Sequence, residues 1–455
     1  MMPSFDDTIA AISTPVGVGG IGIVRLSGPQ ALIIAERLFQ PRVRKLADNP
    51  RILCYGWVQD PDNGETVDEV LVSYMPAPNT YTCQDVVEVN AHGGPLVLRR
   101  ILGLCLGCGA RLAEPGEMTL RAFVNGRIDL TQAEAVRDVI MARTEASLRQ
   151  AVGQLSGRLA AKVRSLRQQV VQCLAAVEAA IDFDEEDTAT VDMADELAAV
   201  CQAMQGLLQT ARGGIIRRQG FKVAIVGRPN VGKSSLMNAL LGTERAIVTP
   251  VPGTTRDTLE EAANIGGLAV VFVDTAGLAE EPVDAVERIG MERARRALES
   301  ADVVVLVLDA SQPLTAADYG VAEAVACAPE ALVVWNKVDL PTVPQASPLP
   351  GRRQVRVSAL TGAGLPELES TLLGTVLEGE VVAGDASLTS DRHRQAVERA
   401  LEAARLANEA LASGTPLDMV ALDLKATADA LGEVTGETVH DEVLATIFST
   451  FCVGK

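Results

Sequence analysis

The sequence predicts a multidomain protein of the α/β plus α class, in which a mostly parallel α/β unit is inserted into a helical domain. Three observations support this prediction. Short apolar segments alternate with turns at the N-terminus, apolar residues then recur at three- and four-residue steps, and a strand–loop–helix motif interrupts the helical pattern. With 455 residues and 48% hydrophobic content, the chain is long enough for several cores.

The N-terminal part, residues 1 to about 118, predicts a small α/β or α+β domain, because short apolar strands alternate with turns. The expected strands lie at 8–12, 21–26, 67–74 and 85–89, and the expected helices at 29–40 and 94–108.

The helical part begins at Thr119. The pattern Thr131-Gln-Ala-Glu134 predicts a capping box that opens a helical stretch. Apolar residues spaced three and four apart over 148–181 predict one long helix, which ends at an acidic segment. We expect a further helix at roughly 191–212.

The helical pattern resumes beyond the inserted unit. Residues 390–411 predict one helix, Pro416 at the first helical position predicts another, and 440–448 predict a short last helix. The domains are therefore expected at 1–118 (N-terminal), 119–217 (helical, first part), 218–376 (inserted) and 377–455 (helical, second part).

A glycine-rich loop, Gly227-Arg-Pro-Asn-Val-Gly-Lys-Ser234, lies between an apolar strand at 223–226 and a helix that begins near Ser235. This is the setting of a phosphate-binding loop. Its backbone N–H groups and the helix N-terminus can face a polyphosphate. Lys233 can reach the β- and γ-phosphates, and the Ser234 hydroxyl can ligate Mg²⁺.

The base is predicted by Asn336-Lys337-Val-Asp339, which follows an apolar strand. The Asp339 carboxylate can accept from both N1–H and the 2-amino group of guanine, whereas adenine has no such donor pair. The segment Ser358-Ala359-Leu360 can supply a backbone N–H to guanine O6. We therefore expect GTP rather than ATP.

Two segments between these motifs predict the switch elements. Asp274-Thr-Ala-Gly277 ends an apolar strand, which places Asp274 for the Mg²⁺ shell and the Gly277 N–H for the γ-phosphate. Gly253-Thr-Thr-Arg-Asp257 is the expected first switch, with Thr255 as the second Mg²⁺ ligand. The four ordered motifs resemble translation-factor-like GTPases, which predicts a Ras-like, mostly parallel sheet.

The hydrolytic machinery lacks two usual parts. Leu278 occupies the position where many GTPases have a glutamine that orients water, and no arginine finger is evident. Positive charge at the transition state accelerates GTP hydrolysis by about 10³–10⁵. Because Asn230 offers a side-chain carbonyl near the β–γ bridge, we expect a monovalent cation held by Asn230 and carbonyls of the first switch.

The composition limits the partners and the compartment. The formal net charge is −19, so any contact with nucleic acid requires a local basic face or a partner. The eight cysteines are scattered without a disulfide pattern, as expected in the cytoplasm. We find no signal-peptide pattern and no apolar run of ~18 residues, so we expect no membrane-spanning helix.

Three other motifs carry weaker signals. Gly17-Val-Gly-Gly-Ile-Gly22 fits a dinucleotide fingerprint, but a strand follows it instead of a helix, which favours a tight glycine turn. Cys105-Leu-Gly-Cys108 lacks a second pair at zinc spacing, which favours burial of small residues. His92, in a turn after a strand, is compatible with a general base or with a structural role.

The C-terminal segment Phe448-Ser-Thr-Phe-Cys-Val-Gly-Lys455 is too apolar for a frayed tail, and we expect it to dock on the protein. This ending, the N-terminal Ile21-Gly-Ile-Val-Arg25 and a GTPase inserted into a helical domain occur together. In this combination, the whole chain resembles the MnmE (TrmE) family of tRNA uridine-modification GTPases.

The resemblance implies a folate-binding N-terminal domain, similar to tetrahydrofolate-dependent aminomethyltransferases, which also mediates homodimerisation. Arg25, Glu88, Arg127 and Lys455 would contact 5-formyltetrahydrofolate or another tetrahydrofolate derivative. The family often has lysine where this chain has Arg127, so the charge is kept while the contact geometry changes. Cys452 would take part in the modification chemistry.

The resemblance also implies that Glu287 orients the attacking water, beside Asn230 as the second catalytic residue of the GTPase. The two prolines in the loop 249–254 depart from the family pattern and would stiffen it. K⁺ would bind Asn230, Thr249, Val251 and Thr254. Motifs and resemblance together predict GTP contacts from Asn230, Val231, Gly232, Lys233, Ser234, Ser235, Thr249, Pro250, Val251, Pro252, Gly253, Thr254, Thr255, Asp274, Thr275, Ala276, Gly277, Asn336, Lys337, Asp339, Ser358, Ala359 and Leu360.

The implied function is the formation of 5-carboxymethylaminomethyluridine at the tRNA wobble position, jointly with the flavoprotein MnmG (GidA) in an α2β2 heterotetramer. The partner would carry FAD and much of the tRNA contact, which suits the acidic charge of this chain. Two alternatives remain open. One is a GTPase switch in ribosome or complex assembly, which needs no folate pocket. The other is a folate-dependent one-carbon transferase regulated by GTP.

Overall fold

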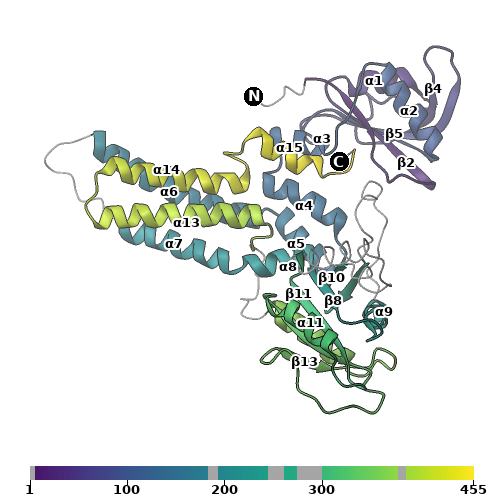
Figure 1. Ribbon diagram of the computed structural model, residues 1–455. Helices are drawn as coiled ribbons and strands as arrows, with labels where there is room; N and C mark the ends of the chain where they lie inside the picture. The colour runs from purple at the N-terminus through teal and green to yellow at the C-terminus, as the bar shows by residue number, and fades with distance from the viewer. Residues whose placement is uncertain (1–5, 183–192, 244–260, 274–299, 378–385, 455) are drawn as a thin grey trace, which may run out of the picture. The chain divides into compact units, whose positions relative to one another are not determined.

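The structure, a computed structural model, describes residues 6–182, 193–243, 261–273, 300–377 and 386–454 (Figure 1). Contacts divide the chain into two compact units. Unit 1 comprises Met1–Arg137, Leu155–Val191 and Ser413–Lys455, and unit 2 comprises Asp138–Gln154 and Asp192–Ala412. The predicted combination of α/β and helical parts is confirmed, because each unit pairs one sheet with packed helices.

Unit 1 contains a seven-stranded sheet with two covering helices. Its elements are β1 (Ile9–Ile12), β2 (Gly19–Ser27), α1 (Ala31–Leu38), β3 (Phe39–Pro41), β4 (Leu53–Gln59), β5 (Thr66–Met75), β6 (Val86–Gly93), α2 (Pro95–Gly107) and β7 (Arg111–Leu112). The strand order is β3-β4-β5-β6-β2-β1-β7, and all neighbouring pairs are antiparallel except β1 with β7.

The alternation of side chains along β2 and β6 determines which residues lie on the face of this sheet away from α1 and α2. Val24 and Val89 are buried in the core that α1 and α2 cover. Arg25 and Glu88, one position away, therefore point to the opposite face. The two residues lie directly opposite each other in the antiparallel register, so the sheet places a partly covered ion pair on the face away from α1 and α2.

The glycine motif before this pair differs from its prediction. Gly19, Gly20 and Gly22 lie within β2 and not in a tight turn, and the strand register shifts between Gly19 and Gly22. A Cβ at Gly22 would lie 2.4 Å from Leu98 Cδ1 of α2. The glycine is required here by close packing of the helix on the strand.

The remaining helices of unit 1 are α3 (Glu117–Val124), α4 (Leu130–Met141), α6 (Arg158–Asp182), α14 (Leu417–Thr435) and α15 (Asp441–Ser449). Helix α14 packs along α6 (Figure 1). The buried stripe of α6 includes Val163 and Val170, and that of α14 includes Leu424 and Leu431. The apolar stripe predicted from the periodicity is therefore buried where these two long helices pack together.

The single long helix predicted over 148–181 is wrong. The structure has α5 (Glu145–Leu155) and α6, separated by Ser156 and Gly157. Gly157 has a φ of +80°, which ends the first helix in the left-handed region. Gln132 Nε2 then donates to the Leu155 carbonyl at 3.0 Å. The apolar stripe continues across this break, which is why periodicity alone did not reveal it.

The predicted capping box at Thr131 is also wrong. Helix α4 already begins at Leu130, and its cap is Asp129. Asp129 Oδ1 accepts from the Gln132 backbone N–H at 3.0 Å, and Gln132 Oε1 accepts from the Asp129 N–H at 3.0 Å. This reciprocal pair is a capping box two residues earlier, because aspartate caps a helix as well as threonine does.

Unit 2 contains a six-stranded sheet. Its elements are α5, α7 (Ala194–Gln209), α8 (Ala211–Gln219), β8 (Phe221–Val226), α9 (Lys233–Thr243), β9 (Glu261–Ile265), β10 (Leu268–Val273), β11 (Val303–Asp309), α11 (Ala316–Ala326), β12 (Ala331–Asn336), β13 (Arg353–Arg356), α12 (Leu365–Leu377) and α13 (Asp391–Ala412). The strand order is β13-β12-β11-β8-β10-β9, and every neighbouring pair is parallel except β9 with β10.

Both faces of this parallel sheet are covered, so its central strand is buried throughout and apolar up to its last residue, Asp309. All seven residues of β11 are buried. Val305 packs in a core with Leu236 of α9 and Leu368 of α12, whereas Leu306 packs in a core with Val325 of α11. Alternate residues thus serve opposite faces. The helix expected at 191–212 is divided into α7 and α8, and α7 packs along α13.

Candidate nucleotide and tail sites

The phosphate loop follows β8 and leads into α9, as predicted from the sequence. Lys233 Nζ donates to the carbonyl oxygens of Gly227 at 2.8 Å and Arg228 at 2.9 Å, which folds the side chain back over the loop. Burial lowers the pKa of Lys233 from its ordinary value. An anionic phosphate at this position would offset that desolvation.

Three residues give the loop its shape. Gly227 and Gly232 have φ values of +153° and +97°, and Asn230 lies in the left-handed region at +64°. A Cβ at Gly232 would lie 2.2 Å from Asn336 Nδ2, so glycine is required by the close approach of that side chain. Asn230 is exposed, and asparagine tolerates the left-handed region better than most residues.

The base-recognition motif is tied to the phosphate loop by Asn336. Its Nδ2 donates to the Val231 carbonyl at 2.9 Å, and its Oδ1 accepts from the Ala359 N–H at 3.0 Å. Ser358 Oγ donates to Asp339 Oδ1 at 2.6 Å. The phosphate loop and the predicted segments 336–339 and 358–360 therefore lie together. Asp339 is exposed, and one of its carboxylate oxygens accepts from Ser358.

Arg228, in the phosphate loop, is held away from a role as a catalytic arginine. Its Nε lies 3.2 Å from Asp318 Oδ1 in α11, and its Nη2 donates to Gln312 Oε1 at 3.0 Å. Asp318 is only 1% exposed and also caps α11 together with Thr315. Because its guanidinium is engaged by these two residues, we do not assign Arg228 as an arginine finger.

Several predicted residues lie outside the described part of the chain. They are Thr249, Pro250, Val251, Pro252, Gly253, Thr254, Thr255, Asp274, Thr275, Ala276, Gly277, Leu278, Glu287 and Lys455. The switch ligands of Mg²⁺ and K⁺, the water-orienting glutamate and the terminal lysine therefore stay predictions.

Two of the predicted folate residues, Arg25 and Arg127, lie close enough to Tyr81 for their charges to act on its hydroxyl, and Arg25 pairs with the third, Glu88. Arg25 Nε donates to Glu88 Oε1 at 2.8 Å across β2 and β6. The Arg127 guanidinium lies 4.8 Å from the centre of the Tyr81 ring and donates to the Tyr81 carbonyl at 3.2 Å. Burial raises the pKa of Tyr81, and a hydroxyl contact with Thr119 and the charges of Arg127 and Arg25 oppose that rise. Tyr81 was not anticipated; its position in a turn-rich segment was the only cue.

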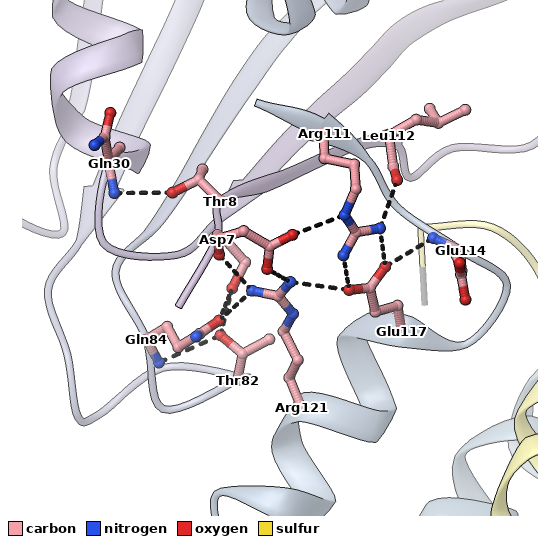
Figure 2. A network of polar contacts seen from close by, with 11 residues as sticks. Asp7, Thr8, Gln30, Thr82, Gln84, Arg111, Leu112, Glu114, Glu117 and Arg121 are labelled. Carbon is pink, nitrogen blue, oxygen red and sulfur yellow. Dashed lines mark hydrogen bonds and ion pairs between the residues drawn. The ribbon is translucent and has the colours of Figure 1, made fainter. Parts of the chain in front are cut away.

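A polar network fixes the loop that carries Tyr81. Figure 2 shows the Arg121 guanidinium between Asp7, Gln84 and Glu117. Arg121 is 0% exposed, so these partners satisfy a charge that is costly to bury alone. The Thr82 carbonyl accepts from Asn125 Nδ2 at 2.6 Å. The loop is therefore held directly after Tyr81, at Thr82 and Gln84.

The C-terminal segment docks on unit 1, which confirms that expectation. Phe451 is buried, and its ring lies 5.4 Å from that of Phe448. Val453 forms an antiparallel bridge with Pro115, and the Gly116 N–H donates to the Cys452 carbonyl at 3.4 Å. Cys452 itself is exposed.

The weaker motifs have structural explanations. Cys105 is buried in the core of unit 1, and among the described residues no group of three or more His, Cys, Asp and Glu side chains is arranged for a metal ion. His92 Nδ1 lies 2.7 Å from Asp68 Oδ1, and this contact raises the pKa of His92. None of the described helices is long and apolar enough to cross a membrane.

A parallel sheet with a phosphate loop after β8 and a guanine-recognition motif after β12 defines a P-loop GTPase. Family comparison extends this assignment to the other parts of the chain. A model of the MnmE helical domain matches residues 130–452, and a model of the GTP-binding protein TrmE N-terminus matches residues 8–127.

Curated relatives match over the full length. The tRNA modification GTPase MnmE of Chloroflexus aurantiacus is 50% identical over 99% of this chain and 100% of its own length. That of Roseiflexus sp. is 46% identical over 99% and 100%. A crystal structure of Era from Aquifex aeolicus is 32% identical over 40% of this chain and 66% of that chain, with a TM-score of 0.28. The chain belongs to the MnmE family of tRNA modification GTPases, and it is a GTP hydrolase.

Proposed function

We propose that this chain is a K⁺-dependent GTP hydrolase that adds a carboxymethylaminomethyl group to C5 of the tRNA wobble uridine. It does so with a flavin-containing partner of the MnmG (GidA) type and a folate one-carbon unit. Membership of the family supports a role in tRNA modification. Folate binding, the K⁺ requirement and the flavoprotein partner are further parts of the proposal, and each has separate support.

The cation proposal rests on the phosphate loop. Mg²⁺ would be held by Ser234 and Thr255, as in other P-loop GTPases. K⁺ would be held by the Asn230 side chain and by Thr249, Val251 and Thr254, and would supply the positive charge that an arginine finger supplies elsewhere. The exposed, left-handed Asn230 fits this role, because its side chain is not needed to fill a core. Glu287 would orient the attacking water.

The folate proposal rests on the cluster around Tyr81. Arg25 and Arg127 supply positive charge that suits the carboxylates of a folate tail, and Glu88 can accept from the N–H donors of a pterin ring. These three residues and the C-terminal segment come from four separate parts of the sequence. When bound, the folate would supply a one-carbon unit, and Cys452 and Lys455 would lie near it.

The assembly proposal follows from charge and family. With a net charge of −19, the chain would leave much of the tRNA contact to the flavoprotein in a cytoplasmic α2β2 heterotetramer. The domain 1–118 would form the homodimer, and the GTPase domain 218–376 would divide the helical domain into 119–217 and 377–455.

One observation carries the proposal: the carbonyl oxygen of Gly454 accepts from both Ser13 Oγ and Arg25 Nη1, which brings the Cys452 segment to the charged cluster. The test is Glu88→Gln, which keeps the shape of the side chain and removes its charge. Tetrahydrofolate binding by purified protein and the modified nucleoside in a complemented deletion strain should both fall, while GTP turnover is unchanged. Glu69→Gln, on the adjacent strand, is the control. Normal tetrahydrofolate binding and normal modification in the Glu88→Gln variant would remove Glu88 from the folate site, whereas a deletion strain that keeps the modified nucleoside would favour the assembly-switch alternative.

A further inference from the structure

A buried carboxylate lies directly behind the nucleotide site. Asp309 is the last residue of β11, pairs in register with Asn336 of β12, and is 3% exposed. Its Oδ2 accepts from Lys337 Nζ at 2.7 Å. Its Oδ1 accepts from the Ser311 N–H at 2.9 Å and from Ser311 Oγ at 2.6 Å. Each oxygen thus has its own partner.

Lys337 is the residue that Asp309 restrains. It has a φ of +66°, a region that a lysine seldom adopts and that costs of order 1–3 kcal/mol. This conformation turns the chain away from β12 between Asn336 and Asp339. Lys337 Nζ also donates to the Asn230 carbonyl at 2.8 Å. One ammonium group therefore joins the base-recognition loop to the phosphate loop.

The charge state of Asp309 fits this arrangement. Burial by itself raises the pKa of a carboxyl group, but the bonds from Lys337 and Ser311 outweigh burial and hold the pKa of Asp309 below its ordinary value. The carboxylate is thus ionised at neutral pH. A buried ionised group is costly unless it is well paired. Removing the charge of Asp309 should therefore mainly weaken the restraint on the Lys337 ammonium group.

We propose that Asp309 is a positioning residue for guanine-nucleotide binding, which acts through Lys337 and does not touch the nucleotide. It orients the Lys337 ammonium group toward the Asn230 carbonyl and thereby keeps the left-handed turn that presents Asp339. This role concerns nucleotide affinity and does not depend on the folate or the flavoprotein.

The first test is Asp309→Asn in the full chain. Asparagine keeps the volume and can still accept from Ser311, but its amide N–H₂ faces the Lys337 ammonium group. We expect the Kd for GDP and the KM for GTP to rise about 10- to 100-fold, the effect of losing one charge-assisted bond, with little change in kcat at saturating GTP. An unchanged Kd would overturn the proposal.

A double-mutant cycle separates positioning from general stability. Lys337→Met should weaken GDP binding, and Asp309→Asn should add no further loss in the Lys337→Met background. An equal loss in both backgrounds would show that Asp309 does not act through Lys337. In a Trp57→Phe background, fluorescence of Trp335, buried in β12, reports whether each variant is folded. If Asp309→Asn does not fold, Ser311→Ala keeps the charge and removes one restraint on it; a measurable rise in Kd is expected, and no rise would overturn the proposal.

Discussion

The Gly454 carbonyl oxygen lies 3.4 Å from Arg25 Nη1, although the two residues are 429 positions apart in the chain. Arg25 also pairs with Glu88 on the neighbouring strand. The C-terminal segment is therefore held by the same arginine that the folate proposal requires. The Arg25 side chain therefore connects the C-terminal segment to Glu88.

This link predicts that Gly454→Ala abolishes tRNA modification while GTP hydrolysis continues. Gly454 has a φ of +90°, and a Cβ at this position would lie 2.6 Å from the Ile12 carbonyl oxygen. The substitution should displace the segment and leave Cys452 chemically intact. The measurement is the wobble-uridine nucleoside content of a complemented deletion strain, together with GTP turnover of the purified protein.

Two further variants distinguish docking from chemistry. Deletion of Cys452 to Lys455 should have the same effect as Gly454→Ala, because neither variant has the segment in its docked position. Cys452→Ser should keep the docking contacts, which are made by backbone atoms, and lose only what the thiol contributes. Full modification by Gly454→Ala would mean that docking of the segment is not needed.

A second prediction concerns the monovalent cation. GTP turnover should fall when K⁺ is replaced by Na⁺ at equal ionic strength, because the positive charge at the transition state would be lost. Asn230→Gly should remove the difference between the two salts. Glycine is the matched choice, because Asn230 has a φ of +64° and alanine would add backbone strain at that position. Equal turnover of the unmodified chain in both salts would refute the K⁺ site.

A third prediction concerns the base. Asp339→Asn should lower GTP affinity about 100-fold or more, because two bonds to a charged acceptor are lost. Ser358 Oγ donates to Asp339 Oδ1 at 2.6 Å and would hold the corresponding oxygen of the asparagine. The amide N–H₂ would then face the base edge, where xanthine has a carbonyl and guanine an amino group. Competition binding with GTP and xanthosine triphosphate tests this; an unaltered preference would remove Asp339 from the base site.

The setting of the phosphate loop was predictable because its motif is local. A strand, a glycine loop and a helix are adjacent in the sequence, and so the setting of Lys233 and Ser234 could be inferred from neighbours alone. Asp309 was missed, although it follows an apolar strand and sits at its carboxyl end. Its role depends on the topology, which the sequence pattern did not give: the parallel pairing of β11 with β12 brings Asp309 beside the base-recognition motif.

The tail site was predictable only in outline. The apolar sequence around Phe451 indicated docking, but not the partner surface, because the bridge to Pro115 joins residues far apart in the chain. The helix errors have the opposite cause. At Gly157 a local backbone conformation ended the helix, and the longer-range periodicity concealed it. At Asp129 the local cap lies two residues before the Thr131 motif, which resembled a cap more closely.

The last prediction concerns the ion-pair network of unit 1. Burial alone would raise the pKa of Glu117, but bonds from Arg111, the Glu114 N–H and Arg121 outweigh it, and the pKa lies below its ordinary value. The pKa of Asp7 is lowered in the same way against burial, by Arg111 and Arg121. A lowered carboxyl pKa stabilises the folded state above the ordinary value of 4.5 for Glu117, and that stability is lost as the pH falls through the lowered pKa.

Glu117→Gln should therefore destabilise unit 1 by about 3 kcal/mol near neutral pH, because it leaves the buried Arg121 with one carboxylate fewer. Below the lowered pKa the difference between the variant and the unmodified chain should shrink, since Glu117 is then protonated in both states of the latter. The chain has two tryptophans, and Trp335 lies in unit 2. In a Trp335→Phe background, Trp57 fluorescence follows unfolding of unit 1 alone. A stability difference that stays constant from neutral to acid pH would contradict an ionised Glu117 as the source of the effect.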